Sequence, residues 1–425
     1  AGSLGAARAP VRALRGRRAT GLVTRRWVGR AQGARAGSFG ASAPTPRTRM
    51  TRHYLDHNAT TPLRPEARDA MLDVLGSPAN ASAIDAGGRA MRARIEGARA
   101  EVAALVGASP ADIVFTSGGT EGATTLLAPG FAGTTRLVVG AVEHSCVLSG
   151  GRFPAGDVAV SPVDRDGRID LDALDRELAK PGMALVAVQA VNNETGVIQP
   201  LAEVARLCRA REAALVVDAV QAIGKIDLDV ATLGADALFV SGHKFGAPQG
   251  VGAIWSRTAF PALHRGGGQE NRRRAGTENA PGIVAMGAAA RALRRTAAEE
   301  RERIAGARDW IEAAVRPMYP STVVLGGGVE RVANTSSLLL PGVSAETAVI
   351  AFDLANVSVA TGSACASGKV ASSHVLAAMG LGPVEARSVV RVSLGWTTTR
   401  TDTEAFVSAL GRHVERVAAR GALVA

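Results

Sequence analysis

The sequence is poor in cysteine and in long apolar runs, and each shortage excludes a class of protein. Three cysteines in 425 residues, at wide spacing, argue against a disulfide framework and favour a reducing compartment. Every apolar stretch long enough to cross a membrane is broken by proline or by charge. The nearest candidate, residues 338–360, contains Pro341, Glu346 and Asp353. We therefore predict neither a disulfide-rich secreted protein nor a membrane-spanning one.

Acidic residues are absent from the first 49 positions, which hold eleven arginines and no lysine. The whole chain has a formal charge of +11, but without this segment it has 38 basic and 38 acidic residues. We therefore expect no nucleic-acid binding. Residues 1–50 are predicted to be a basic N-terminal extension, either a disordered arm or a stretch that is not native, with Met50 as the natural start. A mitochondrial-type transit peptide is the alternative. The predicted location is the cytoplasm, or the mitochondrial matrix if the segment is a transit peptide.

From residue 64 onward, short apolar runs alternate with helical patterns. The runs are continuous rather than alternating, as in a mainly parallel sheet that is covered on both faces. This order predicts an α/β doubly wound domain, followed by a long helix at 281–316 and a mixed α+β segment to residue 425. The predicted strands lie within residues 112–118, 135–144, 183–196, 213–224, 235–244 and 251–256.

Lysine is also scarce, because only four of the 49 basic residues are lysines. Unlike arginine, a lysine can lose its proton in a shielded site and form a Schiff base with an aldehyde. A lone lysine is more often a solvated surface charge. Lys244 differs in context, since it follows a predicted strand in the sequence SGHKFG.

Polar residues follow the other predicted strands, where ligands of open α/β sheets bind. Asp218 ends a run of small apolar residues, so it either caps the next helix or pairs with a buried cation such as a protonated pyridine nitrogen. The turn TSGGTEG at 116–122 suits a phosphate, and Ser241 and His243 would add donors to it. His144 either stacks on a flat ring or is an ordinary satisfied polar residue. Together these features suit pyridoxal 5′-phosphate (PLP).

With these residues in place, the sequence resembles the PLP-dependent class V aminotransferase family, and within it the cysteine desulfurases of the long-loop, NifS/IscS-like group. The matching stretches follow the family order across nearly all of residues 51–425. They are YLDHNATTP (54–62), FTSGGTE (115–121), EHSCVL (143–148), VNNETGVIQP (191–200), VDAVQAIGK (217–225), SGHKFGAPQGVGA (241–253), GGGQENRRRAGTEN (266–279), TGSACASG (361–368) and VVRVSLG (389–395).

The resemblance implies a PLP-dependent transferase of fold type I. Its large PLP-binding domain would span residues 64–297, and its smaller α+β domain would combine residues 51–63 with 298–425. Lys244 would hold PLP as a Schiff base, Asp218 would pair with the ring nitrogen, and His144 would stack on the ring and move protons. The other residues with implied roles are Gly119, Thr120, Ser241 and His243 at the phosphate, Gln221 at the ring hydroxyl, Asn193 at the cofactor and the substrate, Asn58 and Arg391 at the substrate, and Thr277 at the phosphate of the other subunit of a homodimer.

Cys365, in the stretch TGSACASG, distinguishes desulfurases from other members of this family. The resemblance implies that its thiolate takes sulfur from L-cysteine as a persulfide, releases L-alanine and passes the sulfur to an acceptor such as an iron–sulfur scaffold. No intrinsic metal site is implied, although Cys365 could become a transient iron–sulfur ligand with that scaffold. We expect the other two cysteines, Cys146 and Cys208, to be inert core residues.

The sequence departs from the family pattern at a few positions, which leaves two alternatives. Asp85 stands where many relatives have histidine, Ala123 and Thr124 stand where many have paired asparagines, and Gln269 replaces a histidine of some relatives. The first alternative is another class V enzyme, such as a selenocysteine lyase or an aminotransferase. The second is a non-catalytic sulfur-relay or scaffold-binding protein derived from the family.

Overall fold

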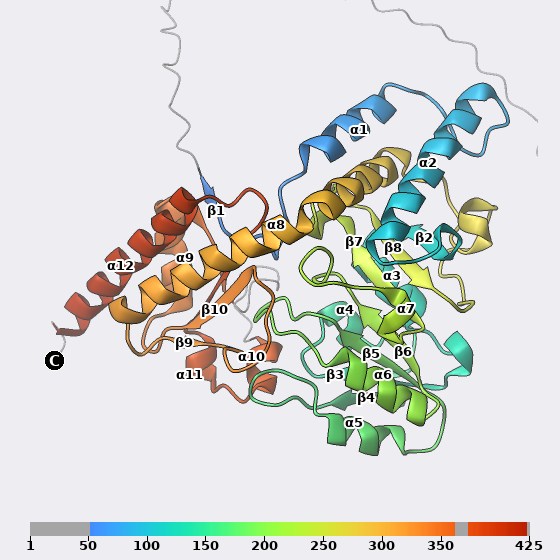
Figure 1. The fold of residues 1–425 in the computed structure, drawn as a ribbon. Helices are drawn as coiled ribbons and strands as arrows, with labels where there is room; N and C mark the ends of the chain where they lie inside the picture. The colour runs from blue at the N-terminus through green and yellow to red at the C-terminus, as the bar shows by residue number, and fades with distance from the viewer. Residues whose placement is uncertain (1–51, 362–372, 423–425) are drawn as a thin grey trace, which may run out of the picture. The chain divides into compact units, whose positions relative to one another are not determined.

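The computed structural model describes residues 52–361 and 373–422, with Met50–Ala425 forming one compact unit. Its described residues build a large sheet, a smaller sheet and the helices around them (Figure 1). None of the described helices is both long enough and apolar enough to cross a membrane.

The large sheet has seven strands among the described residues, in the order β2-β8-β7-β6-β5-β3-β4. Strands β3 to β7 pair in parallel, whereas β8 is antiparallel to both of its neighbours. The strands are β2 (Ile113–Thr116), β3 (Arg136–Gly140), β4 (Val158–Ser161), β5 (Ala184–Gln189), β6 (Ala214–Asp218), β7 (Ala237–Ser241) and β8 (Gly252–Ser256).

All six predicted strands are present in this sheet, so the expected α/β class is confirmed. The patterns did not reveal the direction of β8 or the existence of β4. Strand β8 is buried along its whole length, as a parallel strand would be, and burial leaves no sign of direction in the sequence. Strand β4 is a partly exposed edge strand of only four residues, too short to give a clear period.

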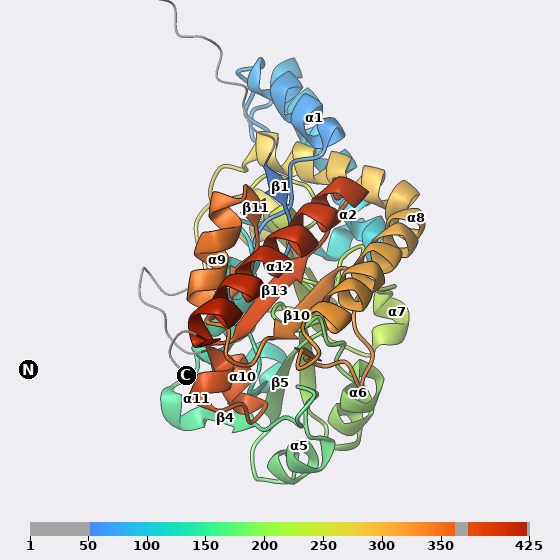
Figure 2. The same cartoon turned by 90° about the vertical axis from the view of Figure 1, so that its left-hand side faces the viewer.

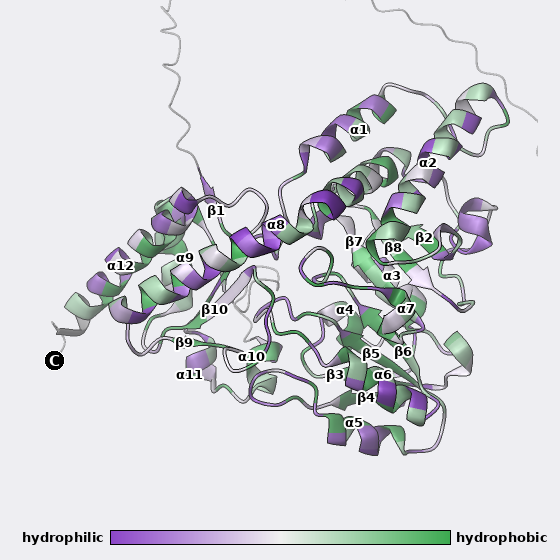
Figure 3. Cartoon of the chain, in the orientation of Figure 1, coloured by the Kyte–Doolittle hydropathy of each residue, from purple (hydrophilic) through white to green (hydrophobic). Residues whose placement is uncertain are grey.

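Helices cover both faces of the large sheet, and alternate side chains of each strand enter two different apolar cores. One core joins Val138, Val186 and Val217 to α2 (Ala86–Leu105), α6 (Leu201–Ala210) and α8 (Ala280–Met318). The other joins Leu137, Val139 and Val216 to α3 (Gly119–Leu126) and α4 (Ser145–Leu148). The hydropathy colouring of Figure 3 shows apolar strands between helices of mixed character. This arrangement leaves the carboxyl ends of β5, β6 and β7 side by side for a site.

A smaller antiparallel sheet forms further along the chain, in the order β12-β13-β10-β9. Its strands are β9 (Val323–Val324), β10 (Thr335–Leu339), β12 (Ala360–Thr361) and β13 (Val389–Ser393), and α9 (Ala345–Leu354) and α12 (Arg400–Ala422) pack nearby (Figure 2). Helix α8 serves both cores, because Met286 and Leu293 enter the core of the large sheet while Ile304, Ile311 and Val315 enter that of the small one.

The remaining elements are short, except α1 at the start of the fold. Strands β1 (His53–Tyr54) and β11 (Val357–Ser358) form a parallel pair. The other helices are α1 (Pro65–Leu75), α5 (Leu171–Leu178), α7 (Val230–Leu233), α10 (His374–Ala378) and α11 (Pro383–Ala386), with 3₁₀ turns η1 (Pro110–Asp112), η2 (Phe131–Gly133), η3 (Ala155–Asp157), η4 (Gly242–Lys244) and η5 (Gln269–Arg272).

Candidate active site

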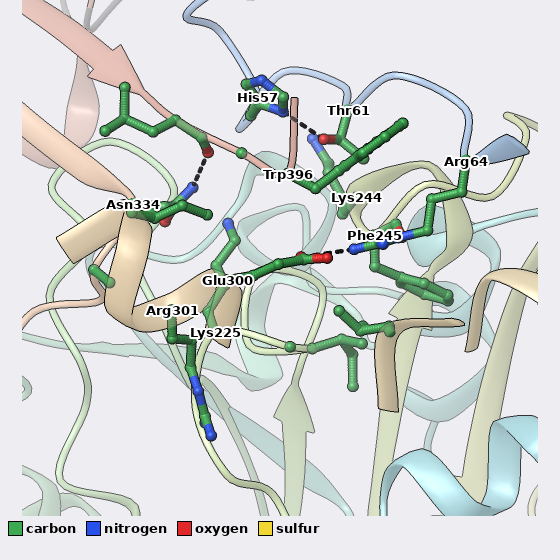
Figure 4. Close-up of a pocket in the computed structure, with 17 residues that line it drawn as sticks. His57, Thr61, Arg64, Lys225, Lys244, Phe245, Glu300, Arg301, Asn334 and Trp396 are labelled. Atoms are coloured by element: carbon green, nitrogen blue, oxygen red, sulfur yellow. Dashed lines mark hydrogen bonds and ion pairs between the residues drawn. The ribbon is translucent and has the colours of Figure 1, made fainter. Parts of the chain in front are cut away.

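Lys244 lies in the 3₁₀ turn η4, directly after β7, and its side chain reaches the segment that follows β1. Its Nζ donates hydrogen bonds to the carbonyl oxygens of Asn58, at 2.6 Å, and Ala59, at 2.9 Å. The same segment is tied to η4 by the backbone, since Thr61 N–H donates to the His243 carbonyl at 2.9 Å. The chain's first strand and the end of β7 therefore meet at this lysine. Figure 4 shows Lys244 at the edge of a cavity of about 60 Å³.

Asp218 is the last residue of β6, next to β7 in the sheet, and only 7% of it is exposed. One carboxylate oxygen accepts a hydrogen bond from Val220 N–H at 2.9 Å. Burial raises the pKa of Asp218 to about 6, against the lowering effect of the Val220 hydrogen bond and the nearby Lys244 charge. The structure thus places a buried carboxylate within electrostatic reach of a lysine, as predicted, and the capping alternative explains only the bond to Val220.

The predicted phosphate turn packs tightly against the end of the sheet. Gly118 has a φ of +155°, which favours glycine, and its absent Cβ would lie 3.6 Å from the Ser241 hydroxyl oxygen. A Cβ on Gly119 would come within 2.9 Å of a Val220 methyl group. Because Gly118 has no side chain to cap α3, the first-turn N–H groups, including that of Thr120, are available to an anion. The turn, Ser241 and Thr120 therefore form one donor-rich corner.

His144 caps the start of α4 and lies near Lys244. Its Nδ1 accepts the Cys146 N–H at 3.2 Å, so this nitrogen carries no proton. Loss of surrounding water, together with the charges of Lys244 and His374, lowers the pKa of His144. His144 is therefore a neutral, exposed ring at physiological pH, with its proton on Nε2, suited to stacking and to donating a hydrogen bond from that nitrogen.

Cys146 packs beside an apolar core of the large sheet, as expected, and it also lies in this corner. Its sulfur is 3.1 Å from His144 Nδ1, and Thr120 and Asp218 both act on it. Burial and the Asp218 charge raise the pKa of the Cys146 thiol to about 12, so it stays protonated. Cys208 is buried in α6, and its pKa is likewise raised to about 12, mainly by burial. Both thiols therefore stay protonated, and both lie within or beside apolar cores, as predicted.

His243 and Thr277, both predicted at the phosphate, differ in their settings. His243 Nδ1 is 3.1 Å from the Thr60 hydroxyl, and burial together with the Lys244 charge lowers its pKa to about 4, so the ring is neutral. Thr277 is exposed in the segment between η5 and α8. An exposed position in this chain suits the prediction that Thr277 serves another subunit, and that role stays a prediction.

Arg391 in β13 meets the end of β5 from the side of the small sheet. Its guanidinium pairs with Asp56 at 2.6 Å and donates to the Asn193 carbonyl at 3.0 Å. Asn58 bridges the same residues, because its side-chain amide donates to the Asn193 carbonyl at 3.1 Å and to the Thr335 hydroxyl at 2.9 Å. The three residues predicted to bind substrate are thus brought together. Arg391 Nε is buried without a partner among the described groups, so one donor remains for a ligand.

Two buried acids near the site were quoted within motifs but not predicted as site residues. Glu143 accepts the Gln189 N–H at 2.9 Å through one oxygen, while burial raises its pKa well above the ordinary range and the Asp218 charge adds to this. Glu194 accepts a hydrogen bond from the Ser373 hydroxyl at 2.6 Å, and burial raises its pKa to about 7 against the effects of Ser373 and Arg391. Their neighbours in the sequence, His144 and Asn193, were the available signal.

Cys365 lies outside the described residues, so its predicted role stays a prediction. In the described ranges, 52–361 and 373–422, no group of three or more His, Cys, Asp or Glu side chains could hold a metal ion.

These features fit PLP. The cofactor needs an amine for its aldehyde, a carboxylate for its ring nitrogen and N–H donors for its phosphate. Lys244, the buried Asp218 and the Gly118–Gly119 turn supply these three groups, just beyond the carboxyl ends of β7, β6 and β2. A protonated ring nitrogen beside Asp218 would favour its carboxylate form and oppose the effect of burial on this pKa.

Comparisons with known proteins agree with this geometry. A family model described as aminotransferase class-V matches residues 53–406. A cysteine desulfurase of Cereibacter sphaeroides is 38% identical over 381 residues, which cover 87% of this chain and 97% of that protein. A human cysteine desulfurase is 36% identical over 380 residues, covering 86% and 82%. The crystal structure of a NifS-like protein from Rickettsia africae aligns with a TM-score of 0.79 and 32% identity, covering 86% of this chain and 100% of that one. The chain belongs to the class-V aminotransferase family, together with these cysteine desulfurases.

Proposed function

We propose that this chain is a PLP-dependent cysteine desulfurase, a sulfurtransferase that converts L-cysteine to L-alanine. The observation that carries the proposal is the meeting of Lys244, Asp218 and the glycine turn at adjoining strand ends, in a chain 38% identical to a cysteine desulfurase over most of its length. When bound, PLP supplies an electron sink that stabilises negative charge at the substrate's α-carbon.

The residues around Lys244 would divide the remaining work. The Lys244 amine would bind the cofactor's aldehyde and, once released, move a proton at the substrate's α-carbon. The Asp218 carboxylate would hold the proton on the ring nitrogen, and the neutral His144 would stack on the ring face and help to move protons. Gly119, Thr120, Ser241 and His243 would hold the phosphate, and the amide of Gln221 would bond the ring hydroxyl.

Arg391 would grip the substrate carboxylate with the donor that it does not use inside the protein. Its guanidinium is already fixed by Asp56 and by the Asn193 carbonyl, so little side-chain entropy is lost on binding. Asn58 and Asn193 would complete this subsite. The fixed fork favours an α-amino acid with a free carboxylate over an amide or an ester.

Sulfur would leave the substrate by transfer to Cys365. The Cys365 thiolate attacks the substrate sulfur, an S–S bond forms and the C–S bond breaks, and the carbon then takes up a proton. The sum is L-cysteine plus enzyme thiol giving L-alanine plus enzyme persulfide. The substrate carbon is reduced by two electrons and the two sulfur atoms together are oxidised by two, so no outside oxidant is needed.

Several finer statements also belong to this proposal. We infer a homodimer in which Thr277 reaches the partner's phosphate site, a division into domains at 64–297 and at 51–63 with 298–425, and an iron–sulfur scaffold or other protein as sulfur acceptor. The proposed compartment is the cytoplasm, with the mitochondrial matrix as the alternative if residues 1–49 are a transit peptide. Light scattering tests the homodimer. The intact mass of the native protein shows whether residues 1–49 are present, and so tests the transit-peptide alternative.

The test combines an absorbance spectrum of purified protein with product assays after L-cysteine is added. We expect a visible band from bound PLP that is lost in Lys244→Ala, with alanine and sulfide released together in the presence of a reductant. Cys365→Ser is expected to lose this activity, whereas Lys180→Ala, at an exposed surface lysine, is expected to retain it.

Other outcomes of this test point to the alternatives. A visible band with no sulfide, or with activity that survives Cys365→Ser, would indicate another class V reaction such as that of an aminotransferase or a selenocysteine lyase. The absence of a band when PLP is supplied would contradict the proposal and favour a non-catalytic relay protein.

A further inference from the structure

A second lysine, Lys225, shares the cavity of Lys244, and no motif assignment above gives it a task. Figure 4 shows both ammonium groups at this cavity, which is also lined by Asn334 and Trp396. Burial, followed by the positive charges of Lys244 and Arg391, lowers the pKa of Lys225 well below its usual value. A lysine surrounded by positive charges in a buried place is costly. The contacts of its ammonium group show what this burial achieves.

The ammonium group of Lys225 binds two neutral amide oxygens. Its Nζ donates to Asn58 Oδ1 at 2.9 Å and to Gln221 Oε1 through a short contact. Because Lys225 donates to the oxygen of each amide, the nitrogen end of each amide faces away from it. The lysine thus determines how these amides are turned.

Gln221 is the residue whose orientation depends on this contact. With Oε1 held by Lys225, its Nε2 points the other way and donates to the Asn58 carbonyl at 3.0 Å, the same oxygen that accepts from Lys244 Nζ. The side chain of Asn58 needs Lys225 less, because Asn334 Nδ2 also donates to its Oδ1, at 3.0 Å. The N–H end of Gln221 is therefore aimed at Lys244 by two contacts, and Lys225 supplies one of them.

The backbone delivers Lys225 to this place through Gly224. Gly224 has a φ of +75°, and a Cβ there would lie 2.8 Å from both methyl groups of Leu293 in α8. The turn from Gln221 to Lys225 is thus built so that the two side chains meet four residues apart.

We propose that Lys225 is a positioning residue that keeps the N–H end of Gln221 turned toward Lys244 and the cofactor, acting through Gln221 rather than on the substrate. This inference rests on the proposed function, in which Gln221 donates to the hydroxyl of the PLP ring. With Lys225 removed, Gln221 Oε1 loses its donor, the amide gains a second orientation, and the bond to the cofactor forms in only part of the molecules.

The test is a double-mutant cycle on PLP affinity in the full chain. The dissociation constant is measured by titrating apoprotein with PLP and following absorbance and fluorescence. Lys225→Met is expected to raise this constant about fivefold in the wild-type background, the factor expected from one hydrogen bond, and by less than twofold in the Gln221→Ala background. Lys225→Arg keeps the donors and borders an empty cavity, so it is expected to restore affinity to within about twofold of wild type.

Equal effects of Lys225→Met in both backgrounds would overturn the inference, since they would mean that the lysine acts without Gln221. No effect in the wild-type background would overturn it too. If Lys225→Met apoprotein does not fold by circular dichroism, Lys225→Gln replaces it in the same cycle. Lys180→Met, at an exposed lysine, is the control for loss of a positive charge. Failure of the wild-type chain to bind PLP would instead contradict the proposed function, so the two failures are distinguishable.

Discussion

Replacing Asp218 by asparagine should stabilise the apoprotein while it impairs the function of the site. Burial raises the pKa of Asp218 from 3.8 to about 6, so the folded protein resists ionising a group that ionises freely when the chain is unfolded. At about 1.36 kcal/mol per pKa unit, this difference costs the folded apoprotein roughly 3 kcal/mol above pH 7. Asparagine has the same shape and no charge, and its oxygen can still accept the Val220 N–H.

The sign of the effect follows from proton counts. Between pH 3.8 and about 6 the folded apoprotein holds more protons at this position than the unfolded chain, so its stability falls as pH rises and then levels off. Asparagine removes this fall. The stability gain of Asp218→Asn should therefore be close to zero below about pH 3, about half of its full value at pH 5 and roughly 3 kcal/mol at pH 7 and above.

Urea unfolding of apoprotein at several pH values between 5 and 8 measures this gain. Asp69→Asn, at an exposed carboxylate, is the control and should change the free energy of unfolding by less than about 0.5 kcal/mol at every pH. A gain from Asp218→Asn that does not vary with pH would refute the reasoning, as would a loss of stability at pH 8. With PLP added the order should reverse, because only wild type has a carboxylate to pair with the ring nitrogen.

Three further changes test other parts of the site. Arg391→Lys should raise KM for L-cysteine at least tenfold, with a smaller effect on kcat, in steady-state kinetics. A lysine ammonium cannot pair with Asp56 and bind the substrate carboxylate at the same time, as the planar guanidinium can. Glu194→Gln should remove the part of the fall in apoprotein stability that Glu194 contributes as pH rises from about 4.5 through 7, so its stability gain over wild type should be larger in thermal melts at pH 8 than at pH 6. Gly252→Ala should cost about 2–3 kcal/mol in urea unfolding and weaken PLP binding, because its Cβ would lie 2.7 Å from Gly118 Cα.

The sheet and the ends of its strands could be predicted because both follow from local pattern. Continuous apolar runs mark strands that are buried on both faces, and the polar residue that ends each run marks the edge where ligands bind. The structure accordingly brings Asp218, His243 and Lys244 to adjoining strand ends. The family resemblance, rather than the pattern, supplied Gln221, Asn58 and Arg391.

Residues whose importance arises from long-range packing could not be found in this way. Asp56 pairs with Arg391 across 335 positions, and Lys225 meets Asn58 across 167. No local period records such pairs. Cys146 is a related case: it packs beside the core as expected, but no local pattern shows that the short helix α4 also carries it into the candidate site. The departure at Asp85 has a local explanation, since its side chain caps α2 by accepting the Gly88 N–H at 2.7 Å.

The charges at this site share one physical property, which links its stability to its chemistry. Asp218 is a buried acid with a raised pKa, and Lys225 is a buried base with a lowered one, so each is held in a place that disfavours its charged form. Such placements lower the stability of the apoprotein, and selection for stability alone would remove them. A bound cation at Asp218 would recover part of this cost, and Lys225 keeps an amide in the orientation that such a ligand needs. Cofactor binding should therefore stabilise the wild-type chain more than it stabilises Asp218→Asn, which has lost the partner of the ring nitrogen, or Lys225→Met, which has lost the group that orients Gln221.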